Sequence, residues 1–162
     1  MKKLRLYLDT SVINFMFADD APEKRDATRD FFTRYVATKH YDVAVSAVVI
    51  AEIERTEDGR HRQALLGVIS DYNIMKLETE PIEEVTTLAD AYIELGALPA
   101  KSYNDALHVA LCSVHEIDVL LSWNYSHLAN VNKERKILAV NQTNGYLYPL
   151  RIVTPLEVME DE

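Results

Sequence analysis

Three acidic residues and one asparagine are the candidates for chemistry in this sequence. Two of them follow predicted strands, and the other two lie in predicted helices. Asp9 closes the apolar run LRLYL, and Asn124 follows the apolar run IDVLLSW. Glu52 and Asp105 fall within the apolar segments SAVVIAEI and DALHVALC. Carboxylates that converge without basic partners repel one another, and the usual resolution is a divalent metal. The four positions therefore predict a metal-dependent hydrolase that acts on phosphate esters.

Alternating strands and helices would bring these positions to one edge of a sheet. Short runs rich in Val, Ile and Leu predict buried parallel strands at residues 4–8, 41–46, 73–78, 117–123 and within 148–158. Helical spacing of apolar residues predicts helices at 11–17, 22–39, 47–55, 61–72, 81–98, from 102, from 124 to about 132, and at 133–145, with a turn at 57–62. This pattern predicts one three-layer α/β/α domain over residues 1–162, with a central parallel sheet of about four to five strands and an acidic tail from about residue 157.

Helix capping is an ordinary explanation for two of the acids. Asp9 precedes a predicted helix and could cap it, although Thr10 or Ser11 could do the same. Asp105 is the third residue after Ser102, which matches the S-x-x-D capping box. Thr10 and Ser11 could instead donate hydrogen bonds to the Asp9 carboxylate or to a water on a metal. A structural role therefore remains open for each of these residues taken alone.

Glu52 is harder to explain by capping, because its neighbours at helical spacing are mostly apolar. A carboxylate beside a buried stripe needs a partner, although a place at the solvent edge of the helix would also explain it. His108 follows Asp105 by three residues and could share its helix face. A metal-ligand role is not favoured for this histidine.

Three tyrosines flank the acidic positions, at Tyr7, Tyr103 and Tyr125. Aromatic rings at such places could stack on nucleic-acid bases. Packing in the core or at its rim is the favoured interpretation for each.

The net charge of −9 is unusual for a protein that binds nucleic acid, since such proteins generally carry a basic surface. Basic residues nevertheless cluster within 24–34, 55–62 and 133–136. These clusters are either solvated helix faces or local patches that bind phosphate. The charge balance therefore does not exclude a nucleic-acid substrate.

Cys112 is the only cysteine, and it lies on an apolar stripe, so we expect it in the core. The N-terminal residues lack the apolar stretch of a signal peptide, and no run is long enough to span a membrane. These features together predict a cytoplasmic protein without a membrane partner.

The segments LDTSVIN, VSAVVIAEI, NDALHVALC and LLSWN occur in the order found in the PIN domain family, which the whole chain resembles. The resemblance implies a nuclease that uses Mg²⁺ or Mn²⁺ to hydrolyse RNA phosphodiester bonds. Many relatives are VapC-like toxins of toxin–antitoxin pairs, which form homodimers and are silenced by an antitoxin protein. By position, Asp9, Glu52 and Asp105 resemble the acidic metal ligands of the family. Ser122 and Asn124 fall where many members have Ser or Thr and a fourth acid.

Asn124 is a departure from the family pattern. An amide can offer a carbonyl oxygen to a metal or its water, but it brings no charge. Three negative charges would then stand where a fuller site has four, which weakens binding of a second metal. The alternative function is therefore a catalytically weakened PIN-like module that binds RNA or protein.

An unrelated α/β phosphatase is a less favoured alternative. A haloacid-dehalogenase-type enzyme needs a second Asp two residues after the first, and Ser11 occupies that place. The amphipathic helix 22–39 and the segment SVINFMF are candidates for a homodimer or antitoxin interface.

Overall fold

A five-stranded, all-parallel sheet forms the centre of the protein. The structure is a computed structural model and describes residues 2–124 and 128–160. The strands run in the order β3-β2-β1-β4-β5, with bounds β1 Arg5–Leu8, β2 Asp42–Ser46, β3 Met75–Leu77, β4 Val119–Leu121 and β5 Arg151–Val153. The predicted α/β fold with a parallel sheet is confirmed, and the strand number is five.

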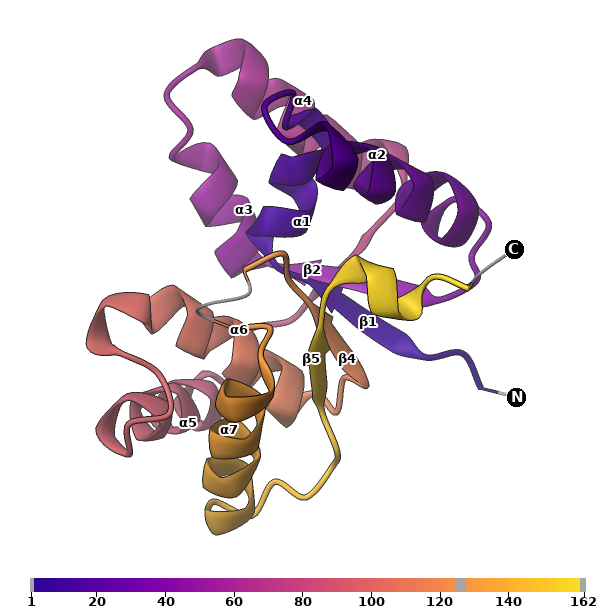
Figure 1. Ribbon diagram of the computed structural model, residues 1–162. Coiled ribbons are helices and arrows are strands. Elements are labelled where there is room, and N and C mark those ends of the chain that lie inside the picture. The colour runs from indigo at the N-terminus through magenta and orange to yellow at the C-terminus, as the bar shows by residue number, and fades with distance from the viewer. Residues whose placement is uncertain (1, 125–127, 161–162) are drawn as a thin grey trace.

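Within the described residues, seven α-helices cover the sheet, with α1 to α4 gathered on one side and α5 to α7 on the other (Figure 1). Their bounds are α1 Thr10–Asn14, α2 Pro22–Phe31, α3 Ala47–Glu54, α4 Gly59–Asp71, α5 Ile82–Glu94, α6 Tyr103–Val114 and α7 Val131–Thr143. A π-helical turn, Phe32–Val36, extends α2, and short 3₁₀ helices span Phe15–Phe17, Ala100–Ser102 and Pro155–Val158. In the described part of the chain, no helix is both long and apolar enough to cross a membrane.

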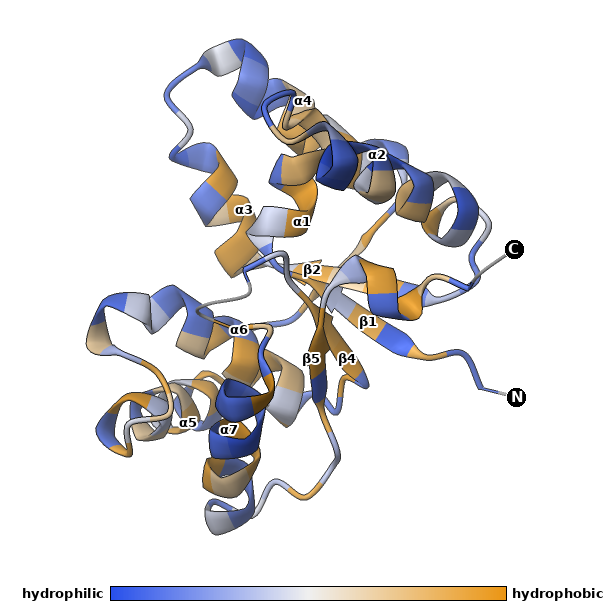
Figure 2. Cartoon of the chain, viewed as in Figure 1, coloured by the Kyte–Doolittle hydropathy of each residue, from blue (hydrophilic) through white to orange (hydrophobic). Residues whose placement is uncertain are grey.

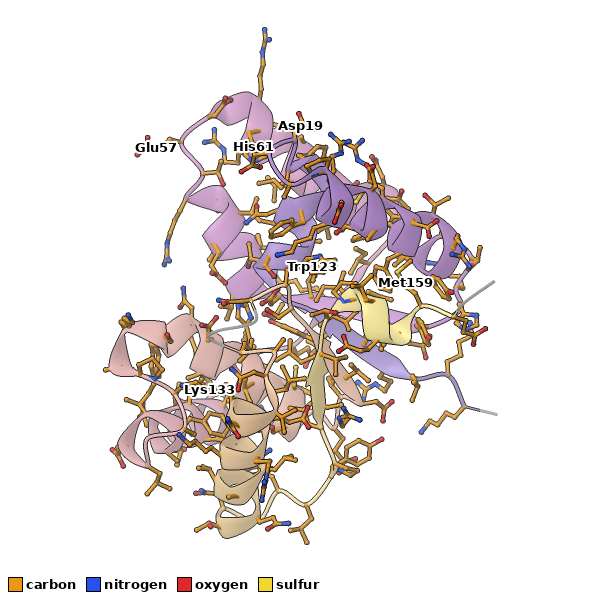
Figure 3. All side chains as sticks on the ribbon, in the orientation of Figure 1. Asp19, Glu57, His61, Trp123, Lys133 and Met159 are labelled. Atoms are coloured by element: carbon orange, nitrogen blue, oxygen red, sulfur yellow. The ribbon has the colours of Figure 1, made fainter. Side chains whose placement is uncertain are left out.

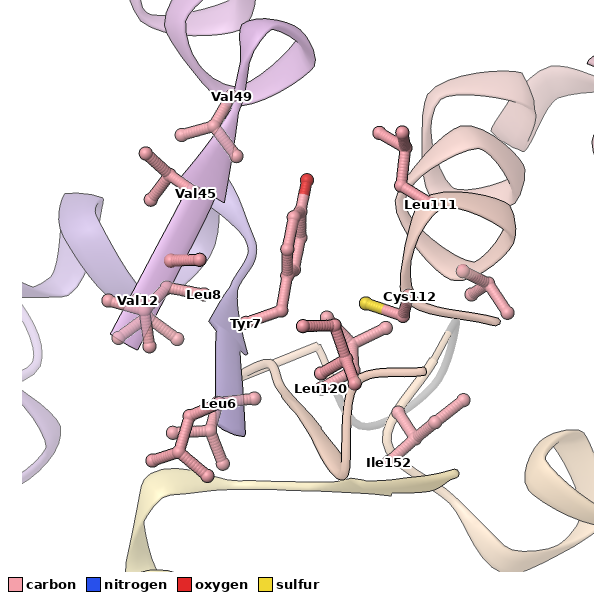
Figure 4. Packing of buried hydrophobic residues seen from close by; sticks show 14 of the residues in the cluster. Leu6, Tyr7, Leu8, Val12, Val45, Val49, Leu111, Cys112, Leu120 and Ile152 are labelled. Atoms are coloured by element: carbon pink, nitrogen blue, oxygen red, sulfur yellow. The ribbon is translucent and has the colours of Figure 1, made fainter. Parts of the chain in front are cut away.

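The apolar residues lie where the strands predict them. Leu6, Tyr7 and Leu8 of β1 are fully buried, as expected for a central strand covered on both faces. Hydropathy colouring shows the apolar strands between helices whose outer faces are polar (Figure 2). Cys112 of α6 packs beside Tyr7 and is buried, which confirms its predicted core role (Figure 4).

The strand order reverses between β1 and β4. Strands β2 and β3 extend the sheet from one side of β1, and β4 then pairs with the other side of β1. Ligand sites in open parallel sheets form at the carboxyl ends of the strands next to such a reversal. Asp9 follows β1 directly, and its backbone N–H donates to Leu121 O of β4 at 3.1 Å. The fold therefore places Asp9 at this switch point.

Helices α1 and α4 begin before their predicted starts. Asp9, rather than Thr10 or Ser11, is the N-cap of α1, because its extended backbone lets its carboxylate accept from Ser11 N. Asp58 caps α4 in the same way, so the helix begins at Gly59 inside the predicted turn 57–62.

The predicted helix from 124 to about 132 is wrong for residues 124 and 128–130, whereas residues 131 and 132 belong to α7. Residues 128–130 form turns and bends. Asn130 has an extended backbone and accepts from Lys133 N at 2.9 Å, which starts α7 at Val131. Residues 125–127 of that prediction, including the tyrosine at 125, lie outside the described residues.

Candidate functional site at the carboxyl edge of the sheet

Asp9 is a buried carboxylate at the switch point, with only 5% of its surface exposed. Its Oδ1 atom accepts hydrogen bonds from the backbone N–H of Ser11 at 3.0 Å and from the Ser11 hydroxyl. Burial raises the pKa of Asp9, and hydrogen bonds from Ser11 and Ser122 oppose that rise. The carboxylate is therefore held by its neighbours in a place that disfavours its charge.

Ser11 and Ser122 tie the end of β1 to the exit of β4. The Ser11 hydroxyl donates to Asp9 and accepts from the backbone N–H of Trp123 at 2.9 Å. The Ser122 hydroxyl accepts from the backbone N–H of Asn124 at 3.0 Å. These contacts account for the two serines as supports of the Asp9 carboxylate and of the segment that carries Asn124.

Trp123 anchors this segment in the core, near the middle of the molecule (Figure 3). Its indole Nε1–H donates to Thr28 Oγ1 of α2 at 2.9 Å, and Thr28 in turn donates to Lys24 O at 2.6 Å. Trp123 is 3% exposed and Thr28 is fully buried, so no water replaces this bond. The α2 helix therefore helps to position the loop after β4.

Replacing Thr28 with valine is expected to lower the free energy of unfolding by about 1–3 kcal/mol, because the buried indole N–H loses its acceptor. The melting temperature would fall by about 2–10 °C in a chain of this size. Trp123 is the only tryptophan, so its fluorescence reports the change directly. Thr33→Val is the matched control, since the exposed Thr33 hydroxyl also bonds a carbonyl four residues back but accepts no indole bond. An equal loss in both variants would contradict the anchoring role.

Glu52 reaches the same edge from α3. Its Oε1 atom accepts from the Thr10 hydroxyl at 3.0 Å and lies 2.7 Å from His108 Nε2. Burial raises the pKa of Glu52, but the His108 and Thr10 contacts outweigh it, so the pKa lies below its ordinary value. Glu52 is therefore a partnered carboxylate that also lies at the solvent edge of its helix, with its side chain 27% exposed.

The contact of His108 with Glu52 was not predicted from the sequence. The histidine is 1% exposed and lies between Glu52 and the fully buried Tyr7, whose hydroxyl is 2.6 Å from His108 Nδ1. The available signal was its position three residues after Asp105, on one helix face. Tyr7 belongs to the core, so the base-stacking interpretation of this tyrosine is wrong.

A polar cleft of about 600 Å³ opens between α3 and the start of α6. It brings together three of the predicted residues, Glu52, Asp105 and Asn124. The remaining lining residues are Lys101, Ser102, Tyr103 and Asn104. Asp9 lies beside this cleft rather than in its lining, joined to it through its neighbour Thr10.

The predicted capping box at the start of α6 is absent. Ser102 is the N-cap residue by position, but its side chain makes no capping hydrogen bond. A capping box therefore does not explain Asp105. This residue lies in the first turn of α6 and lines the cleft. Tyr103 also lines the cleft, with 37% of its surface exposed.

The cleft offers oxygen ligands of the kind that Mg²⁺ and Mn²⁺ take. Among residues 2–124 and 128–160, no three His, Cys, Asp or Glu side chains are already arranged to hold a metal ion. Mg²⁺ commonly uses one or two carboxylates, keeps several waters and adds substrate phosphate oxygens. The carboxylates of Glu52 and Asp105 and the amide oxygen of Asn124 match that incomplete set.

The basic cluster on α2 is largely paired within the chain. Arg25 contacts Asp19 at 2.9 Å and Asp26 at 3.0 Å, and Arg34 contacts Asp30 at 3.0 Å. These exposed pairs favour a solvated helix face over a phosphate-binding patch in this cluster. Lys101 is the basic residue in the lining of the cleft itself.

Comparison with known proteins agrees with this geometry. The profile of the PIN domain matches residues 6–133. The chain belongs to the PIN domain family. No curated protein matches it at a significant level. The match confirms the predicted family.

Solved structures share the PIN fold at low identity. One is a chain of VapBC2 from Rickettsia felis, in a structure bound to a promoter DNA fragment. It has a TM-score of 0.57 and 14% identity, and the alignment covers 92% of this PIN domain and 98% of that chain. A chain of FitAB bound to the IR36 DNA fragment has a TM-score of 0.56 and 15% identity, covering 97% and 99%. A chain of VapBC-5 from Mycobacterium tuberculosis has a TM-score of 0.48 and 15% identity, covering 93% and 98%. At these identities the first two structures support the fold alone.

Proposed function

We propose that this PIN domain is a Mg²⁺- or Mn²⁺-dependent endoribonuclease and the toxin of a toxin–antitoxin pair. The observation that carries the proposal is the cleft at the switch point, where Glu52, Asp105 and Asn124 line one polar space beside the buried Asp9. PIN domains are generally nucleases, which fits a site of carboxylates without a protein nucleophile.

Each side chain has a role in this proposal. Asp105 and Glu52 would hold a cation from the cleft, and Asp9 would add negative charge from beside it. Asn124 would offer an amide oxygen to the cation or to its water. A divalent ion bound there would lower the pKa of a water bound to it and would offset negative charge on the phosphoryl oxygens.

The supporting residues keep these groups in place. Thr10 holds the Glu52 carboxylate, Ser11 holds Asp9, and Ser122 holds the backbone of Asn124. Lys101 lines the cleft, and its ammonium group is suited to a phosphate of the RNA backbone. Attack of water in line with the 3′ oxygen would leave products with 5′-phosphates.

The remaining parts of the proposal concern partners and location. We propose that the chain acts as one domain in the cytoplasm, forms a homodimer and is inhibited by an antitoxin protein. Its fold is similar to chains of VapBC2 and FitAB. That likeness supports a comparable assembly without identifying the partner.

A second candidate function is a PIN-like module that binds RNA or protein without cutting. Asn124 favours it, because the cleft lacks the charge of a fourth acid. Partnering of Glu52 by two hydrogen bonds favours the nuclease, because it keeps one acid oriented at the cleft.

Cleavage of a mixed RNA pool separates the two functions. The purified chain is expected to cut RNA with Mg²⁺ or Mn²⁺ and to stop when EDTA removes the metal. The products should accept ligation that requires a 5′-phosphate. RNA binding without cleavage at any metal concentration would favour the binding module instead.

A further inference from the structure

A chain of hydrogen bonds runs through the core and ends on Glu52. The backbone N–H of Val48 donates to Ser46 Oγ at 3.2 Å. Ser46 Oγ lies 2.7 Å from Tyr7 Oη, and Tyr7 Oη lies 2.6 Å from His108 Nδ1. His108 Nε2 lies 2.7 Å from Glu52 Oε1. The contacts link β2, β1, α6 and α3 in sequence.

The acceptor at the end of this hydrogen-bond chain indicates where its protons lie. The Glu52 carboxylate can only accept, so His108 Nε2 carries a proton and donates to it. In a neutral imidazole Nδ1 is then the acceptor, and Tyr7 Oη donates to it. The Tyr7 hydroxyl can in turn accept from the Ser46 hydroxyl, which accepts from the Val48 amide.

The hydrogen-bond chain is shielded from water up to Glu52, where it reaches the cleft. Ser46 and Tyr7 are fully buried and His108 is 1% exposed, whereas the Glu52 side chain is 27% exposed. Water therefore cannot replace an inner member if that member is removed. The Thr10 hydroxyl also donates to Oε1, so both described contacts lie on the same carboxylate oxygen. These two contacts fix the orientation of a carboxylate that lines the cleft.

We propose that His108 is a positioning residue, whose Nε2–H holds Glu52 so that its carboxylate meets a divalent cation in the cleft. This inference rests on the proposed function in one respect, which is that Glu52 takes part in binding the cation. Residues that orient a metal ligand from behind commonly change metal affinity or activity by about 10–100-fold when removed. Tyr7 and Ser46 orient His108 in turn.

A buried tyrosine elsewhere in the protein provides the matched control. The Tyr92 hydroxyl donates to Asn141 Oδ1 and lies 3.2 Å from Ser113 Oγ. This network joins α5, α6 and α7 and includes no residue that lines the cleft. Tyr92→Phe and Tyr7→Phe therefore remove the same hydroxyl from comparable burial, and only Tyr7→Phe cuts the chain to Glu52.

Mn²⁺ affinity, measured by electron paramagnetic resonance on the purified full chain, tests the proposal without requiring cleavage. His108→Asn is expected to raise the dissociation constant by about 10–100-fold, and Tyr7→Phe to raise it by a smaller factor. His108→Gln, whose amide can still donate to Glu52, should recover part of the loss. Tyr92→Phe should leave the constant unchanged.

A double-mutant cycle shows whether His108 acts through Glu52. In a Glu52→Gln background, His108→Asn should cause no further loss of affinity. A loss that persists there, or one that Tyr92→Phe reproduces, would overturn the proposal in favour of a general structural role.

Imidazole nitrogen shifts of the ¹⁵N-labelled wild-type protein give a readout that needs no variant to fold. His108 is expected to show a proton on Nε2 and none on Nδ1. A proton on Nδ1 of a neutral ring would overturn the proposed direction of the chain.

The outcomes separate this inference from the proposed function. Mn²⁺ binding that depends on His108 without RNA cleavage would overturn only the ribonuclease. Metal-dependent cleavage that is indifferent to His108→Asn would overturn only the positioning role. A wild-type chain that binds no Mn²⁺ would overturn both.

Discussion

Replacing Asp105 with asparagine is expected to lower Mg²⁺-dependent RNA cleavage by about a thousandfold. Asp105 lines the cleft from the first turn of α6, and the change keeps its shape while removing its charge. A metal stabilises the transition state by several kcal/mol, and each 1.4 kcal/mol corresponds to about a tenfold change in rate. Loss of one of two carboxylates in the cleft should therefore remove most of the activity. Initial cleavage rates at saturating Mg²⁺ measure the effect.

Asp71→Asn is the matched control for this experiment. Asp71 is exposed at the last residue of α4, outside the lining of the cleft, and the substitution changes the charge by the same amount. It should leave the cleavage rate unchanged, with both variants folded by circular dichroism. Equal cutting by wild type and Asp105→Asn would point to a contaminating nuclease or to a different site.

Replacing Asp9 with asparagine is expected to abolish cleavage while making the metal-free protein more stable at neutral pH. Burial raises the pKa of Asp9, so the folded state disfavours the charge that it carries at pH 7. Asparagine keeps the shape and is as good an N-cap as aspartate, so α1 should retain its start. The melting temperature should rise by a few degrees, since about 1 kcal/mol corresponds to about 2–4 °C at this size.

The pH dependence of stability identifies the cause of that gain. Between the unfolded pKa of about 3.9 and the raised folded pKa, the folded state binds more protons at Asp9 than the unfolded state does. This contribution to stability therefore falls as pH rises through the window, and the cost persists above it. The melting temperatures of wild type and variant should be similar below the unfolded pKa and should diverge toward neutral pH. A constant difference across this range would assign the effect to something other than the Asp9 charge.

Cation binding should act in the opposite direction. A ligand that binds only the folded state raises its stability, and a cation near Asp9 offsets the charge that burial disfavours. Adding Mg²⁺ at pH 7 should therefore raise the melting temperature of the wild type more than that of Asp9→Asn. An equal rise in both proteins would show that Asp9 does not contribute to binding the cation.

The parallel sheet could be predicted because its strands depend on local composition. The runs around Leu6, Val45 and Leu120 are short and apolar, and these three residues are fully buried in the sheet. The helix starts were less predictable, because several residues near each start can cap it. Asp9 caps α1 in place of Thr10 or Ser11, and Ser102 makes no capping bond. These choices depend on backbone angles that the rest of the fold sets.

The contacts at Glu52 could not be predicted from sequence spacing. His108 lies 56 residues from Glu52 and 101 residues from Tyr7 along the chain, and it contacts both. No local rule pairs residues at such separations, so the contacts of this histidine could not be predicted. Only the tertiary packing brings His108 of α6 against both Tyr7 and Glu52.

The sequence by itself determined that acids would meet at the carboxyl edge of a parallel sheet, because strand composition and element order decide that topology. Only the tertiary structure decided how each acid is held there. Asp9 is buried beside the cleft with a raised pKa, whereas Glu52 is partnered with a lowered one. The physical reason is that desolvation and hydrogen bonding depend on which distant residues surround a carboxylate, and three-dimensional packing supplies those neighbours.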